Sequence, residues 1–207
     1  MFPAAQKSTT NKNNLPKFIV LEGVDGSGKT TAAHYIAQKL NYEYFKTPGD
    51  IFSAVRPLFE DKSHVNGRLF FYLGTVLYAS EEIKKTLERG RGVICDRYIY
   101  TTLCYQKAMG ACVSQELEKE IISKLQMPDL TIFLYADKQA RHERLNKRRQ
   151  GTGYRGDQWI EQNDNMQEQL VKLFLQYPVI TLDNSRLNKE QTCQAIINLL
   201  NSAVSNQ

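Results

Sequence analysis

Short apolar runs alternate with longer segments of helical periodicity through most of the 207-residue chain. Apolar runs bounded by turn residues are typical of strands that are buried on both faces of a sheet. The expected strands are residues 18–21, 42–46, 93–95, 130–134 and 178–182. The expected helices are residues 28–40, 68–88, 102–108, 115–125, 138–149, 159–176 and 190–203. Strands that alternate with helices predict an α/β fold in which helices flank a five-stranded parallel sheet.

The composition and the first residues narrow the class of protein. Residues 1–16 are polar and rich in Asn and Thr, so we expect a disordered leader before a single domain over residues 17–207. The apolar runs are strand-sized and no signal-peptide core is present, which predicts neither a membrane protein nor a secreted one. Four widely spaced cysteines favour reduced thiols in a cytoplasmic protein over disulfides or a zinc site.

A phosphate-binding pattern lies between the first expected strand and the first expected helix. Residues 23–30 read Gly-Val-Asp-Gly-Ser-Gly-Lys-Thr and match the P-loop pattern GxxxxGK[ST] at every fixed position. In this pattern backbone N–H groups surround phosphate oxygens, the lysine reaches the β- and γ-phosphates, and the threonine hydroxyl binds Mg²⁺. The sequence therefore predicts a three-layer P-loop NTPase fold that uses ATP and Mg²⁺. The expected ATP-binding residues here are Gly23, Val24, Asp25, Gly26, Ser27, Gly28, Lys29, Thr30 and Thr31.

Two charged residues follow the third expected strand. Asp96 and Arg97 lie at the carboxyl edge of the sheet, where open α/β sheets bind their ligands. An aspartate at this edge can join Thr30 in holding Mg²⁺, and an arginine can grip a phosphate with its planar fork of donors. We therefore expect Thr30 and Asp96 to form the metal site.

Positive charge is concentrated in one later segment. The net charge is +5, and the basic residues gather around residues 141–156 instead of forming a stripe, which favours a small phosphorylated molecule over nucleic acid as the partner. Arg144 is expected to contact ATP, and Arg148 on the same helix is expected to stabilise the transferring phosphoryl group. Glycines flank this segment, so we expect an arginine-rich lid that closes over the phosphates.

Taken together, these elements resemble the thymidylate (dTMP) kinase family from about residue 18 to residue 200. The resemblance is carried by residues 18–31, Lys46-Thr-Pro-Gly49, Asp96-Arg-Tyr98, Thr101-Thr102, Tyr105-Gln106, residues 128–134 and residues 157–162. It implies a nucleoside monophosphate kinase that passes the γ-phosphoryl group of ATP to a deoxynucleoside monophosphate, most simply dTMP. A homodimer is also implied.

The resemblance also implies roles for single residues. Asp25 would orient the acceptor and Arg97 would grip its phosphate, so both join Lys29 and Arg148 as expected catalytic residues. Phe71 would stack on the base. The expected acceptor-binding residues are Asp25, Lys46, Phe71, Thr75, Arg97, Thr102, Tyr105 and Gln106.

Two positions depart from the family pattern. Thr75 stands where the family has an arginine that hydrogen-bonds thymine, so the preferred base is left open. Lys46 replaces an arginine and keeps its charge without the bidentate fork. Three alternatives therefore remain: a relative with another base preference, a deoxynucleoside kinase with Glu22 as its base, and a nucleotide-binding protein without catalysis.

Overall fold

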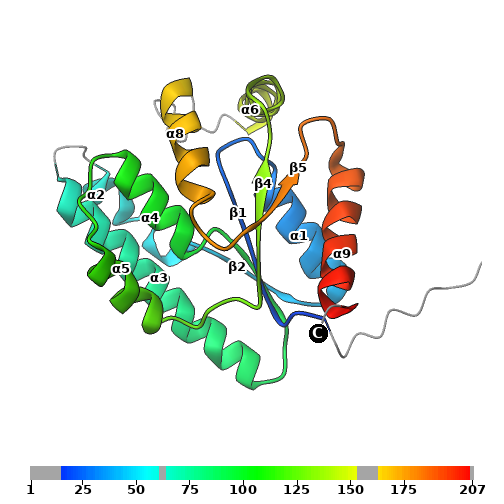
Figure 1. Cartoon of the computed structure of the whole chain (residues 1–207), viewed down its shortest axis with the longest axis horizontal. Coiled ribbons are helices and arrows are strands. Elements are labelled where there is room, and N and C mark those ends of the chain that lie inside the picture. The colour runs from blue at the N-terminus through cyan, green and yellow to red at the C-terminus, as the bar shows by residue number, and fades with distance from the viewer. Residues whose placement is uncertain (1–14, 61–63, 153–162, 206–207) are drawn as a thin grey trace, which may run out of the picture.

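Five parallel strands form the central sheet, in the order β2-β3-β1-β4-β5 (Figure 1). The computed structural model describes residues 15–60, 64–152 and 163–205. The strands are β1 (Phe18–Gly23), β2 (Glu43–Lys46), β3 (Val93–Asp96), β4 (Leu130–Tyr135) and β5 (Ile180–Asp183). The helices are α1 (Lys29–Leu40), α2 (Arg56–Phe59), α3 (Val65–Glu88), α4 (Ile99–Ala108), α5 (Gln115–Ser123), α6 (Lys138–Thr152), α8 (Asp164–Phe174) and α9 (Lys189–Ser205), with a 3₁₀ turn η2 (Asp50–Phe52). The predicted fold class is confirmed.

The side chains of β1 alternate between two apolar cores. Phe18 and Val20 belong to the core that lies against α3, α4 and α8. Ile19 and Leu21 point the other way, into the core beneath α1 and α9. Figure 1 shows these two helix layers on opposite sides of the sheet. Because both faces of the sheet are covered at β1, the residues from Phe18 to Leu21 are all buried, which is why this run is continuously hydrophobic.

The carboxyl ends of the central strands bring the two main phosphate-binding segments together. β1 lies between β3 and β4, and Leu21 is in register with Asp96. The loop after β1 and the turn after β3 therefore leave the sheet side by side, at the position where connections cross over in opposite directions. In Figure 1, α6 and α8 stand above this edge of the sheet.

Several predicted boundaries need correction. The leader was expected to extend to residue 16, but Leu15 is buried in the core and the Pro16 carbonyl accepts a hydrogen bond from the Tyr42 hydroxyl. The glycine-rich interruption was expected from residue 151, whereas α6 continues to Thr152. A glycine near the end of a helix costs only about 1 kcal/mol, so Gly151 does not stop it.

Other parts of the prediction fall outside what the structure describes. Residues 1–14, part of the expected lid (153–156) and the start of the expected helix at 159–162 lie outside the described residues. The 3₁₀ turn η2 and helix α2 had not been predicted. Within the described ranges, no helix has both the length and the apolar character that a membrane span requires.

Candidate active site

The P-loop follows β1 and has a backbone that requires glycine. Gly23 has φ +149°, and a Cβ placed there would lie 2.5 Å from the Leu134 carbonyl oxygen. Gly26 has φ +80°, and its Cβ would lie 3.0 Å from the Arg141 carbonyl oxygen. The loop can therefore pass close to β4 and α6 only without side chains at these positions. It leads into α1, whose N-terminus offers partial positive charge to an anion.

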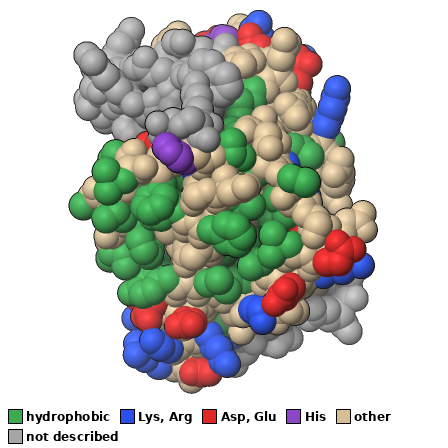
Figure 2. All heavy atoms as spheres, turned by 90° about the vertical axis from the view of Figure 1, so that its left-hand side faces the viewer, with side chains coloured by type: hydrophobic (Ala, Val, Ile, Leu, Met, Phe, Trp, Pro, Cys, Tyr) green, Lys and Arg blue, Asp and Glu red, His purple; other side chains and the backbone are tan. Residues whose placement is uncertain are grey.

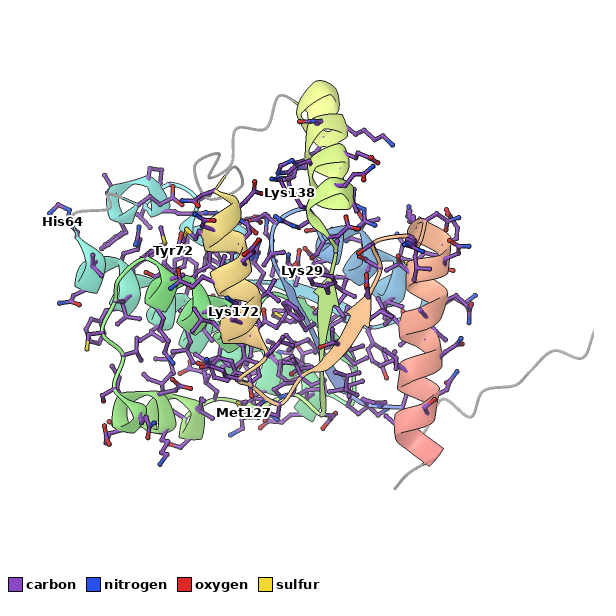
Figure 3. All side chains as sticks on the ribbon, turned by 45° about the horizontal axis from the view of Figure 1, so that its top comes forward. Lys29, His64, Tyr72, Met127, Lys138 and Lys172 are labelled. Atoms are coloured by element: carbon purple, nitrogen blue, oxygen red, sulfur yellow. The ribbon has the colours of Figure 1, made fainter. Side chains whose placement is uncertain are left out.

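Lys29 is held beneath this loop. Its ammonium group donates to the Val24 carbonyl at 2.8 Å and to the Ser27 hydroxyl at 3.3 Å, and the residue is 5% exposed. Figure 3 shows Lys29 near the centre of the molecule, at the start of α1. Burial and the neighbouring Arg97 lower the pKa of Lys29 to about 7. A phosphate bound at the loop would supply the negative charge that favours its protonated form.

Thr30 and Asp96 form a pair of oxygen ligands. The Thr30 hydroxyl donates to Asp96 Oδ2 at 2.5 Å, and the aspartate is 1% exposed. Asp96 Oδ1 is buried and has no hydrogen-bond partner among the described residues. An unpaired buried carboxylate oxygen beside a hydroxyl fits a hard divalent cation such as Mg²⁺. The described residues contain no cluster of three or more His, Cys, Asp or Glu, so such an ion would take further ligands from water and phosphate.

A charged cluster lies on the other side of the P-loop. The Arg97 guanidinium forms an ion pair with Asp25, and Tyr105 donates its hydroxyl hydrogen to the second Asp25 oxygen at 3.0 Å. The guanidinium carbon lies 5.3 Å from the centre of the Tyr105 ring. Burial raises the pKa of the Asp25 carboxyl, but Arg97 and Lys29 outweigh it, so the pKa lies below its usual value and the carboxylate stays ionised.

The backbone of Arg97 is held in an uncommon conformation. It is one of the non-glycine residues with positive φ, at +70°. Its N–H donates to the Leu21 carbonyl at 3.0 Å. Its carbonyl accepts hydrogen bonds from the Thr47 hydroxyl at 2.9 Å and from the Cys95 thiol at 3.0 Å. These contacts compensate for the strain and fix the direction in which the guanidinium points.

Glu22 organises the first turn of α4. One of its carboxylate oxygens accepts hydrogen bonds from the backbone N–H groups of Tyr98 and Thr101, each at 3.1 Å, and the other accepts from the Thr101 hydroxyl. Glu22 is fully buried, and this burial raises its pKa. Because the carboxylate satisfies the free donors at the helix start, it acts as a cap supplied by the sheet. It is therefore not placed to accept a proton from a nucleoside hydroxyl.

A cavity of about 420 Å³ adjoins the P-loop on the side of α6. Arg144 extends along it and donates to the side chain and the carbonyl of Asn184, at 3.0 and 2.7 Å. The Asn184 amide donates to the Ser27 carbonyl at 2.8 Å, which ties the loop after β5 to the P-loop. Residues 184–189 form one wall of the cavity. This cavity has the position and size to receive the base of a nucleotide whose phosphates lie on the P-loop.

The expected base-contacting residues lie on α3 and α4 on the other side of the sheet from this cavity. Thr102 and Gln106 are buried on α4, one turn apart. Phe71 stacks on Phe59 of α2, with ring centres 4.5 Å apart and planes at 4°. Thr75 is also buried, and its hydroxyl donates to the Tyr72 carbonyl of the same helix at 2.8 Å.

Three further residues that were predicted to belong to the site lie around its edges. Lys46 ends β2 beside Asp96 in register, and its side chain is exposed. Thr31 lines the cavity next to the P-loop. Arg148 is exposed on α6, and its charge is one of those that lower the Asp25 pKa, so its electric field reaches the acceptor side of the site.

Comparison with known proteins decides the family. The sequence profile of the family described as "Thymidylate kinase" matches residues 21–196, which includes the P-loop, β3 and α6. The chain belongs to the thymidylate kinase family. The resemblance predicted from the P-loop, the Asp-Arg-Tyr element and the Tyr-Gln pair is therefore confirmed, and with it an enzyme of the nucleoside monophosphate kinase class that uses ATP.

Curated members of the thymidylate kinase family match over most of their length. A probable thymidylate kinase of Pyrococcus abyssi is 31% identical over 198 residues, covering 88% of this chain and 95% of the relative. One from Methanococcus vannielii is 36% identical over 138 residues, covering 65% of this chain and 68% of the relative. The relation thus extends across both the P-loop and the acceptor side.

Solved structures share the fold. Thymidylate kinase from Candida albicans superposes with a TM-score of 0.72 at 20% identity, covering 93% of this chain and 94% of that one. Deoxyadenosine kinase from M. mycoides gives a TM-score of 0.63, also at 20% identity, with coverage of 88% and 98%. At this identity the two structures report the fold alone, which monophosphate and nucleoside kinases share.

Several contacts at this thymidylate kinase site were not predicted. Asn184 directly follows the fifth strand, and polar residues at the carboxyl end of a parallel strand are a signal that could have identified it. Glu22 was weighed as a base and is a helix cap instead. The hydrogen bond that Arg68 donates to the Gln106 side-chain oxygen at 3.1 Å was also not predicted, because a single arginine in a helix usually faces solvent.

Proposed function

We propose that this chain transfers the γ-phosphoryl group of ATP to dTMP, giving dTDP. The observation that carries the proposal is the ion pair of Arg97 with Asp25 directly beside the P-loop. It supplies an arginine fork for an acceptor phosphate next to the place where Lys29 and the loop would hold the γ-phosphate. The family to which the chain belongs and the names of its curated relatives support dTMP as the acceptor.

ATP would occupy the P-loop and the adjoining cavity. Backbone N–H groups of the loop and the start of α1 would bind the phosphates, and the base would enter the cavity alongside Arg144. Thr30 and Asp96 would hold Mg²⁺, which neutralises charge on the β- and γ-phosphates when it is bound. The unpaired Asp96 oxygen supports this assignment.

The residues of the chain act by positioning and by electrostatics. Arg97 would hold the acceptor phosphate so that one of its oxygens faces the γ-phosphorus, and Asp25 with Tyr105 would fix the arginine in this direction. Lys29 and Arg148 would stabilise the charge on the transferring group. An acceptor phosphate is already ionised near neutral pH, so no side chain has to remove a proton.

The first test is the release of ADP from ATP and Mg²⁺ with a panel of acceptors. We expect turnover with dTMP and little or none with thymidine, because Glu22 is occupied as a helix cap. Turnover with thymidine alone would replace the proposal with a deoxynucleoside kinase. A silent panel, with ATP bound, would favour the nucleotide-binding protein without catalysis.

The apolar face of α3 and α2 supports a homodimer as part of this proposal. Gly67, Phe70, Gly74 and Tyr78 form an exposed stripe along α3, with Phe70 58% and Tyr78 47% exposed. Figure 2 shows hydrophobic side chains gathered on this side of the molecule, with most charges around them. A second copy of the chain would cover this apolar stripe, and the two glycines would allow the two helices to approach closely.

The Gly74→Arg variant tests this dimer. Apart from its chain neighbours and the adjoining backbone of α3, no heavy atom of the described residues lies within 4 Å of the position of its Cβ, so the arginine fits the single chain and obstructs the stripe. We expect light scattering to show a dimer for the wild type and a monomer for the variant, whereas two equal masses would contradict this interface.

A cytoplasmic location completes the proposal, supported by four cysteines that are free thiols.

A further inference from the structure

Arg68 is a buried arginine that has no acidic partner among the residues that the structure describes. It lies on the face of α3 that packs against α4 and is 2% exposed. Its Nε donates to the Gln106 side-chain oxygen at 3.1 Å. Among the described residues its guanidinium forms no further hydrogen bond and no ion pair. Buried guanidinium groups are normally paired with carboxylates, so a cation held by one neutral amide indicates donors that are kept for another molecule.

The position of Gln106 relates Arg68 to the acceptor phosphate. Tyr105, the preceding residue, donates to Asp25, which pairs with Arg97. From the start of α4 to Gln106 the helix advances roughly 10 Å, a distance comparable with that from the phosphate of a nucleotide to the far edge of its base. A monophosphate held by Arg97 and lying along α4 would therefore direct its base toward Arg68 and Gln106.

We propose that Arg68 determines the base specificity of the acceptor, with Gln106 as the residue that orients it. The proposal rests on the proposed function, because it assumes that Arg97 holds the acceptor phosphate. Thr75 lies seven residues after Arg68, two turns along the same face of α3, and its own donor is used within the helix. Arg68 thus supplies the hydrogen-bond donor that Thr75 does not.

The chemistry of guanidinium selects a class of base. All of its N–H groups donate and none accepts. Thymine, uracil and guanine present a carbonyl oxygen at the edge where cytosine and adenine present an amino group, which is itself a donor. Arg68 therefore favours keto bases and disfavours amino bases, since an amino group would leave two buried donors facing each other.

The test compares wild type, Arg68→Met and Arg68→Lys with dTMP, dUMP, dGMP, dCMP and dAMP. We expect Arg68→Met to lower kcat/KM for the three keto acceptors by about 10- to 100-fold, and to leave the amino acceptors equal or improved. Arg68→Lys should recover part of the preference, because the lysine keeps a donor but loses the planar fork. The KM for ATP should not change in either variant.

Two controls separate a specific effect from a general one. Arg89→Met removes an exposed arginine after the end of the same helix and should leave every acceptor unchanged. Deoxyribose 5-phosphate, which has no base, should bind wild type and Arg68→Met equally in calorimetry. An equal loss for all acceptors, or an unchanged ratio of keto to amino acceptors in folded variants, would overturn the proposal.

The failure of the proposed function can be recognised separately. If the wild type phosphorylates none of these acceptors, transfer to a monophosphate is refuted. The Kd values of the same five monophosphates then still measure the base preference. A keto preference in binding that disappears in Arg68→Met would support the role of Arg68, and equal Kd values would refute it.

Discussion

Replacing Lys29 with alanine is expected to lower kcat/KM for phosphoryl transfer by about 10³-fold, measured as ADP release with a saturating acceptor. The ammonium group is fixed by the Val24 carbonyl and the Ser27 hydroxyl, so it needs no rearrangement when negative charge develops between the β- and γ-phosphates. A flexible lysine would have to be ordered first. The loss should therefore appear in kcat as well as in KM for ATP.

Lys39 provides the matched control for this substitution. It lies in the last turn of the same helix α1 and is exposed, so Lys39→Ala should keep full activity. Turnover retained by Lys29→Ala would remove Lys29 from the catalytic residues. Loss of the folded state is tested separately by thermal unfolding.

The unfolding experiment has an expected pH dependence of its own. The pKa of Lys29 is about 7 in the folded chain, below its ordinary value of 10.5. Between these values the unfolded chain binds a proton that the folded chain does not, so this lysine makes the wild type less stable as the pH falls from 10.5 toward 7. The Tm of Lys29→Ala minus the Tm of wild type should therefore increase as the pH falls from 10.5 toward 7.

Replacing Arg97 with glutamine is expected to lower kcat/KM for the acceptor by about 10²- to 10³-fold while ATP binding stays within a factor of about three. The variant leaves Asp25 without its closest cation and removes the fork that would hold the acceptor phosphate. Steady-state kinetics with varied acceptor, together with calorimetry for ATP, measure the two effects separately.

Arg97→Lys and Tyr105→Phe serve as comparisons. The lysine restores charge without bidentate geometry and should recover only part of the activity. The phenylalanine keeps the ring beside the guanidinium and loses only the hydrogen bond to Asp25, so its effect should be smaller than that of Arg97→Gln. Equal losses for ATP and acceptor in Arg97→Gln would mean that this arginine does not belong to the acceptor side.

The fold was largely predictable because the three central strands, β1, β3 and β4, each contain a continuous apolar run in the sequence. A strand such as β4 is apolar at nearly every position, and that pattern arises from burial on both faces. Helix α2 was missed because four residues are too few to form a stable helix alone. It is held by the stacking of Phe59 on Phe71, a contact between residues that the linear pattern does not relate.

The site was predictable where its chemistry is contiguous in sequence. The P-loop carries its glycines, Lys29 and Thr30 within eight residues, so one pattern identifies them. The cap formed by Glu22 joins residues 76 positions apart, and Asn184 reaches Ser27 across 157 positions. Such contacts depend on strand order and register, which a sequence pattern does not contain. The stacking partner of Phe71 depends on tertiary packing in the same way.

The cap that Glu22 provides for α4 bears on how such an enzyme can change over evolutionary time. The carboxylate fixes the first turn of α4 to the sheet, and with it the direction of Arg97, without using any residue from the later turns. If Gln106 and the facing side of α3 contact the base as proposed, mutations there can accumulate while the phosphate end keeps its alignment, provided that Tyr105 and its contact with Asp25 are retained. A lineage with this architecture can drift from one nucleobase to another through active intermediates.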